Sequence, residues 1–164
     1  MPSPLILPLF AVTALLALAG AGILLVTGKA VPQLAAHLAF ALGILPLILA
    51  AMAYFVPVLT RSGGAGAIAW WAPLLASGGG ILAIFSFAAD FSAGGLGLAA
   101  ILSGLAALSL GGWTMNRVRN MPGPRHRGVD WYLAALGFLL LAMLAVLLMP
   151  LFPAQRNALR PFHL

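Results

Sequence analysis

Long uninterrupted runs of apolar residues dominate this chain, in place of the alternating or one-sided patterns of strands and helices that face water. A helix needs about 20 apolar residues to cross a bilayer, and five runs reach that length. Because lipid offers no partner to a free backbone N–H or C=O, and because no barrel-like alternation is present, each run is predicted to be a helix. The predicted fold is therefore all-α, a single integral membrane domain of five transmembrane helices at about 4–26, 31–59, 67–89, 94–114 and 129–152, with a polar tail at 153–164.

The breaks between these runs are short and polar or rich in glycine, and 115–128 is the only sizeable loop that the pattern predicts. Composition narrows the class further, because 63% of the residues are hydrophobic and only 6% are charged, against about 25% charged in a soluble domain. This balance excludes a water-soluble enzyme and a nucleic-acid-binding domain. The expected partners are the lipid bilayer and other membrane helices or subunits.

Basic residues in the loops predict the orientation of the bundle. Five arginines fall on the side of the N-terminus and three basic residues on the other, namely Arg61, Arg117, Arg119, Arg125 and Arg127 against Lys29, Arg156 and Arg160. The N-terminus is therefore expected in the cytoplasm and the C-terminus outside, in a bacterial inner membrane. Five aromatic residues near the inner helix ends fit interface anchors: Trp70, Trp71, Trp113, Trp131 and Tyr132.

The polar residues supply no catalytic constellation. Both acidic residues lie at helix ends, where Asp90 terminates a span and Asp130 is expected to cap the start of the fifth helix. No His–acid pair accompanies a Ser or Thr in the spans, so no base for a nucleophile is visible. The chain has no Cys, which excludes disulfides and thiolate metal sites. We expect no enzymatic activity from the isolated chain.

His37 is the exception, because it lies roughly 9 Å into the second predicted helix, within the outer half of the apolar layer. A neutral imidazole there needs a partner for its N–H and another for its lone pair. Two readings remain open, a metal or haem ligand or a hydrogen bond between helices. Helical spacing places His37 on one broad apolar face with Phe40, Ala41, Ile44, Ile48 and Met52.

Two features predict irregular packing of these helices. Pro46 removes one N–H and crowds the carbonyl of Leu42, so a kink is expected beside Gly43. The glycine run 78–80 lies within the third span and lacks the Lys-Ser/Thr of a phosphate loop. It is expected to loosen that helix or to let another helix approach closely.

The segments His37–Gly43 and Ala53–Arg61 resemble the second helix of haem–copper oxidase subunit I-like membrane proteins, closest to the cbb3-type and NnrS-type branches. In those proteins a His near the outer end of this helix binds haem iron, a Gly follows about six residues later, and a Tyr-x-x-Pro-like ending precedes a basic residue. The resemblance implies that His37 is a haem ligand, and it covers one helix.

The end of the chain resembles the entry to a further His-bearing helix in the same family, since Phe162-His163-Leu164 is similar to Ala36-His37-Leu38. The resemblance therefore implies that the chain is the N-terminal part of a longer protein and that His163 is a second cofactor-binding candidate. Copper would bind only if the later helices of the family were supplied. Met143 and Met149 offer thioethers as alternative ligands, although no spacing singles them out.

Two other function classes remain open. One is a non-enzymatic bundle that serves as an assembly or interaction subunit without a cofactor. The other is a transporter, for which the glycine-rich third span is the sole indication.

Overall fold

The computed structural model of the chain describes residues 5–28, 32–88, 93–124 and 126–151. Within these ranges the chain forms helices joined by short turns, and no strand. The helices are α1 (Ile6–Val26), α2 (Pro32–His37), the π-helix η1 (Leu38–Ile44), α3 (Leu45–Leu59), α4 (Ile68–Ala88), α5 (Ala93–Arg119) and α6 (Arg127–Leu148). Because α2, η1 and α3 form one continuous rod, five helices are long and apolar enough to cross a membrane. The predicted all-α, five-span fold is confirmed.

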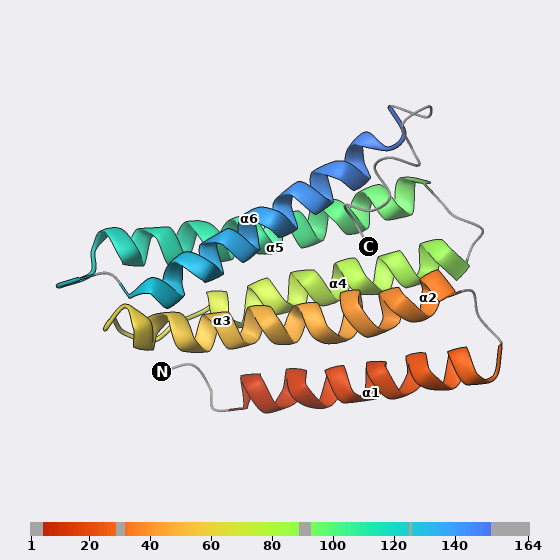
Figure 1. The fold of residues 1–164 in the computed structure, drawn as a ribbon, viewed down its shortest axis with the longest axis horizontal. Coiled ribbons are helices and arrows are strands. Elements are labelled where there is room, and N and C mark those ends of the chain that lie inside the picture. The colour runs from red at the N-terminus through yellow and green to blue at the C-terminus, as the bar shows by residue number, and fades with distance from the viewer. Residues whose placement is uncertain (1–4, 29–31, 89–92, 125, 152–164) are drawn as a thin grey trace.

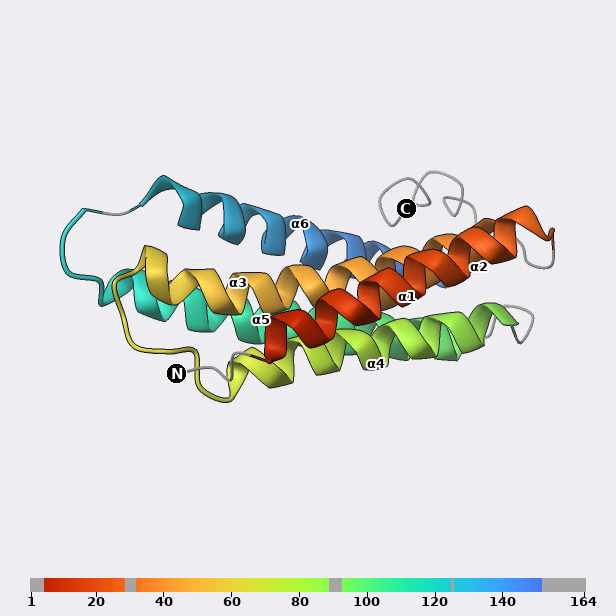
Figure 2. The same cartoon turned by 90° about the horizontal axis from the view of Figure 1, so that it is seen from below.

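Successive spans run in opposite directions and lie roughly along one long axis (Figure 1). The end of the bundle that carries Arg61, Arg117, Arg119 and Arg127 is called here the arginine end, and the opposite end, where α2 begins, the His37 end. Figure 2 shows α1 beside α2 and α3, and α6 crossing the bundle at an angle. In Figure 1 the C-terminal end of α6 rises away from α2.

The fourth span is longer than its apolar run predicts. We expected it to end near residue 114, but α5 continues through Arg119 and α6 already begins at Arg127, so the predicted loop 115–128 shrinks to 120–126. Arg117 and Arg119 lie in the last turn of α5, where positive charge stabilises the negative end of the helix dipole. A hydropathy pattern cannot register such polar turns, since they continue a helix beyond its apolar part.

The start of α6 is capped by a residue other than the one expected. The Nδ1 atom of His126 accepts a hydrogen bond from the backbone N–H of Gly128 at 3.1 Å. Asp130, which we expected to cap this helix, lies within its first turn instead. Its negative charge still stabilises the positive end of the dipole there. Asp90 lies outside the described residues.

The packed core lies in the half of the bundle nearest the arginine end. It joins side chains from all five spans, including Phe10, Leu49, Ala72, Leu110 and Leu136, each at most 4% exposed. Trp70, Trp113 and Tyr132 pack against it. In the other half, the described residues form a smaller cluster between α1 and the second span, made by Ala21, Ala35 and Ala39.

In the middle of the bundle, α4 lies backbone to backbone against two neighbours. A Cβ atom added to Gly80 would lie 2.6 Å from the carbonyl oxygen of Ala41, in η1. One added to Gly79 would lie 2.8 Å from the carbonyl oxygen of Ala99, in α5. The glycine run therefore allows a close approach of helices, which is one of the two outcomes expected from the sequence.

Gly80→Ala should destabilise the fold by about 1–3 kcal/mol, because the new methyl group meets backbone atoms of η1 that cannot rotate away. Gly78→Ala is the matched control, since its added Cβ would lie 3.6 Å from the flexible end of Leu102, an ordinary contact. The measurement is the thermal unfolding midpoint of both variants in detergent. Equal midpoints for the two variants would contradict the close packing of α4 against η1.

A second fixed point lies at the arginine end, where Arg117 holds the loop between α3 and α4. Its Nη1 donates to Ser62 Oγ and to the carbonyl of Gly63, and its Nη2 donates to the carbonyl of Gly64 at 2.7 Å. The guanidinium also lies over the ring of Trp113, 4.5 Å from its centroid. The loop is therefore tied to α5 by a planar group with several donors.

Arg117→Lys should loosen this loop at a cost of about 1–2 kcal/mol, because an ammonium keeps the charge but cannot hold three acceptors in the geometry of a guanidinium. Trypsin cleavage after Arg61, followed on the detergent-solubilised protein, reports the change. Arg119→Lys is the control, because Arg119 lies two residues further along the same helix and is exposed. Unchanged cleavage in Arg117→Lys would show that the loop is held by other contacts.

Candidate ligand cavity

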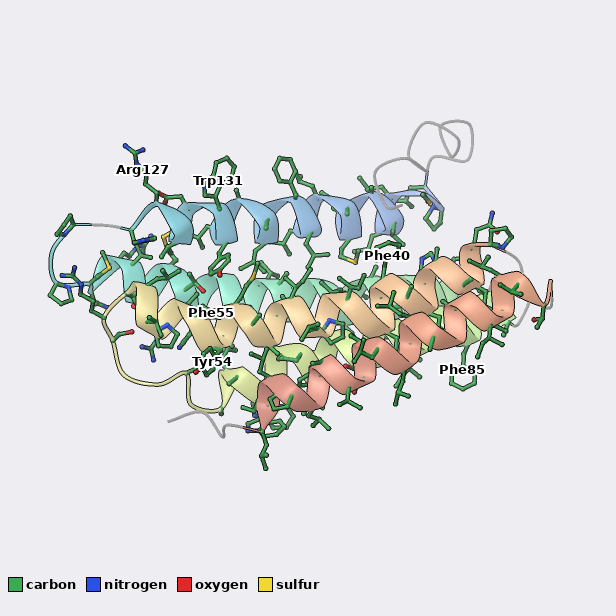
Figure 3. The ribbon with its side chains drawn as sticks, turned by 60° about the horizontal axis from the view of Figure 1, so that its bottom comes forward. Phe40, Tyr54, Phe55, Phe85, Arg127 and Trp131 are labelled. Carbon is green, nitrogen blue, oxygen red and sulfur yellow. The ribbon has the colours of Figure 1, made fainter. Side chains whose placement is uncertain are left out.

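A cavity of about 560 Å³ opens in the half of the bundle nearest the His37 end. The second span forms one wall with Ala36, His37, Phe40, Ala41, Ile44, Leu45 and Ile48. The floor comes from α4 and α5, and α6 forms the opposite wall with Leu139, Met143, Val146 and Met149. Figure 3 shows Phe40 between the second span and α6, whereas Trp131 and Arg127 point away from the bundle.

Small side chains and the angle of α6 together produce this space. The floor of the cavity includes Gly79, Ala83, Ala99 and Ala100, which fill little volume. α6 packs on α5 along its length and on α3 near the arginine end, and it diverges from α2 in Figure 1. The second span and α6 therefore separate over a floor that cannot fill the gap between them.

The helix turns that follow His37 in this wall form a π-helix, at the place where Pro46 predicts a disturbance of the helix. Across Leu38–Ile44 the backbone widens, and the N–H of Leu45 bonds to the carbonyl of Phe40, five residues earlier. Pro46 has no N–H for the carbonyl of Leu42 and its ring crowds that carbonyl, which explains why α-helical bonding fails here. Such widened turns are frequent at functional sites.

The imidazole of His37 is oriented by two contacts. Its Nδ1 lies 2.9 Å from the carbonyl oxygen of Gln33, one turn earlier. Since a carbonyl can only accept, Nδ1 carries a proton, and in the neutral ring Nε2 keeps its lone pair. The ring of Phe87 packs against the imidazole with 4.3 Å between centroids. The side chain is therefore fixed on the cavity wall, and its neutral form has an electron pair to donate at Nε2.

The remaining polar atoms of the cavity are few and uncharged. Ser103 contributes a hydroxyl from α5, and Met143 and Met149 contribute thioethers from α6. Apart from His37, no acidic or basic side chain lines the cavity within the described part of the chain. Nor do the described residues contain a group of three His, Cys, Asp or Glu that could hold a metal ion.

The structure thus brings together His37, Phe40, Ala41, Ile44 and Ile48, which helical spacing had placed on one face. Met52, assigned to the same face, lies in the packed core. His126 lies at the arginine end, and His163 falls outside the described residues. Sequence reasoning missed Ser103, for which the available signal was a hydroxyl within an apolar stretch.

Comparison with known proteins adds no relative. No family model, no curated protein and no solved structure matches this chain. The resemblance of 37–61 to haem–copper oxidase-like proteins therefore has no support beyond the residues that suggested it, and function is inferred from the cavity itself.

Proposed function

We propose that this chain is a multi-pass membrane protein that binds haem in the cavity, with Nε2 of His37 as an axial ligand. The observation that carries the proposal is the orientation of His37, whose Nδ1–H is held by Gln33 so that the lone pair of Nε2 is left for a ligand. A backbone carbonyl behind a histidine is the usual arrangement that fixes the tautomer and ring plane of a metal-bound imidazole.

The size and chemistry of the cavity support the same group. Ligand cavities in proteins measure about 300–1,000 Å³ and are mostly apolar with a few placed polar groups, and this one, at about 560 Å³, lies in that range. A single ion would leave most of the volume empty, whereas a flat macrocycle would occupy it. The described walls hold no Lys or Arg to pair with the haem propionates. The propionates would therefore have to extend through the open side of the cavity.

The chemistry that haem supplies when bound is one-electron transfer or the binding of a diatomic gas. On this proposal the residues of the chain bind and orient the group and keep water away from it. His37 supplies the axial ligand, Phe87 fixes the ring of His37, and the aliphatic side chains of η1 and α6 enclose the macrocycle. The isolated bundle is proposed to have no catalytic group of its own.

A cofactor-free bundle that serves as an assembly subunit is the second candidate. The observation that favours it is the large outer surface of α1 and α6, on which Leu16, Trp131 and Phe138 are each at least 70% exposed. Such a surface is compatible with lipid or with another membrane subunit. In this case His37 would serve packing alone.

Haem binding is tested by expressing the full chain with haem available, purifying it in detergent and measuring the pyridine haemochrome. We expect near-stoichiometric haem in the wild type and a loss of at least tenfold in His37→Ala. His126→Ala is the matched control and should keep its haem, because His126 lies at the opposite end of the bundle.

His37→Leu separates the two candidates. An apolar residue of similar size preserves packing, so a folded His37→Leu without haem beside a haem-bound wild type supports the haem proposal. A wild type without haem, together with a His37→Leu that folds equally well, would overturn the haem proposal and support the assembly subunit.

The proposal also includes the orientation, with the arginine end and the N-terminus in the cytoplasm of a bacterial cell and the C-terminus outside. Since the chain has no Cys, single-cysteine variants give an unambiguous readout. Thr27→Cys, at the His37 end, should react with a membrane-impermeant maleimide on intact spheroplasts. Asn120→Cys, at the arginine end, should react only after the membrane is opened. Both positions are exposed, so the reverse pattern would invert the proposed topology.

A further inference from the structure

Two methionines line the cavity on the wall opposite the second span, Met143 in α6 and Met149 at the C-terminal cap of α6. A thioether is a soft, neutral donor that binds haem iron opposite a histidine in known haem proteins. Met143 and Met149 lie six positions apart along the chain, so they differ in depth by roughly 9 Å, at 1.5 Å per residue. If Nε2 of His37 bound the iron on one face of a macrocycle, a thioether could bind the iron on the other face only from about the same level of the bundle.

Helix contacts give the register between His37 and α6. Ala41 lies against Gly80, so His37, four residues before Ala41, is level with about residue 84 of the antiparallel α4. Gly79 lies between Ala99 and Ser103, which makes residue 84 level with about residue 96 of α5. Leu147 lies 4.0 Å from the Cβ position of Gly97. The level of His37 on α6 is therefore about residue 147 or 148.

This register distinguishes the two methionines. Met149 lies one or two residues from the level of His37, roughly 2–3 Å, whereas Met143 lies four or five residues away, roughly 6–8 Å nearer the arginine end. The contact of Met143 Cβ with the Cβ position of Gly104, at 3.9 Å, places residue 96 of α5 level with about residue 151, and by that contact Met149 lies two residues and Met143 eight residues from the level of His37.

The direction of the side chains keeps this order. Side chains on a helix lean toward its N-terminus, and the N-terminus of α6 is at the arginine end. The side chain of Met143 therefore leans further from the level of His37. By the same rule the side chain of His37 leans toward the His37 end, where its ring packs against Phe87. Met149 therefore remains the nearer of the two methionines.

From this register we infer that Met149 is the second axial ligand of the haem held by His37. The inference rests on the proposed function and identifies the second iron ligand, which a single histidine does not supply. The floor of the cavity separates the two ligand-bearing walls, so the macrocycle would be enclosed between an imidazole on the second span and a thioether on α6.

The test compares Met149→Leu with Met143→Leu in the full, haem-loaded chain. Leucine conserves volume and apolar character, so folding and haem content are expected to persist. The ferric wild type should show the thioether-to-iron charge-transfer band at the red edge of the visible spectrum. Met149→Leu should lose that band and have a lower midpoint potential, because a Met ligand raises the potential. Met143→Leu should keep both.

Each other result has a distinct meaning. Haem in the wild type with an unchanged band and potential in Met149→Leu would overturn this inference and leave the His37 proposal standing. Loss of the band in Met143→Leu alone would overturn the register and assign the deeper methionine. No haem in the wild type, or copper in its place, would overturn the proposed function itself.

Discussion

The close approach of three backbones around Gly79 and Gly80 determines the rest of this structure. At these two positions α4 has no side chain, so η1 lies against one side of it and α5 against the other, at distances that a single methyl group would prohibit. In lipid, where burial of apolar surface gives helices no preference for one another over acyl chains, such contact is a principal source of association. The register of the second span, α4 and α5 is therefore set by backbone contact.

Because of that contact, α6 does not pack beside the second span at the His37 end. α6 packs on α5, which α4 separates from much of η1, and the small floor residues Ala83, Ala99 and Ala100 do not fill the resulting space. An apolar void loses the dispersion contacts that a packed interior makes. A space of about 560 Å³ is therefore expected to be filled in the membrane, by lipid chains or by a ligand. The presence of His37 on its wall is the reason for favouring a ligand over lipid.

The sequence predicted the helices well and the cavity poorly, for a physical reason. Hydropathy depends on local composition, so all five spans followed from it, and the polar end of α5 at Arg119 did not. Helical spacing placed His37, Phe40 and Ile44 on one face. This prediction holds because residues three or four positions apart still lie on one side of the helix where it widens. Three features depend on contacts that hydropathy does not record. They are the π-helix, the cap by His126 and the position of α6 on the opposite side of the cavity. Pro46 indicated that the second span departs from regular α-helical hydrogen bonding, but not that it does so as a π-helix.

The neutral wall of the cavity limits the chemistry that it can support. Its described side-chain donors are an imidazole, two thioethers and a hydroxyl, with no carboxylate, ammonium or guanidinium among them. In a medium of low dielectric constant, a bound group is more stable in the oxidation state with the smaller net charge. A haem centre has one positive charge more when ferric than when ferrous, so such walls favour the ferrous form and raise the reduction potential, in the same direction as a thioether ligand. If haem were bound as proposed, the residues of this cavity would make it an electron acceptor of raised potential and a weak electron donor.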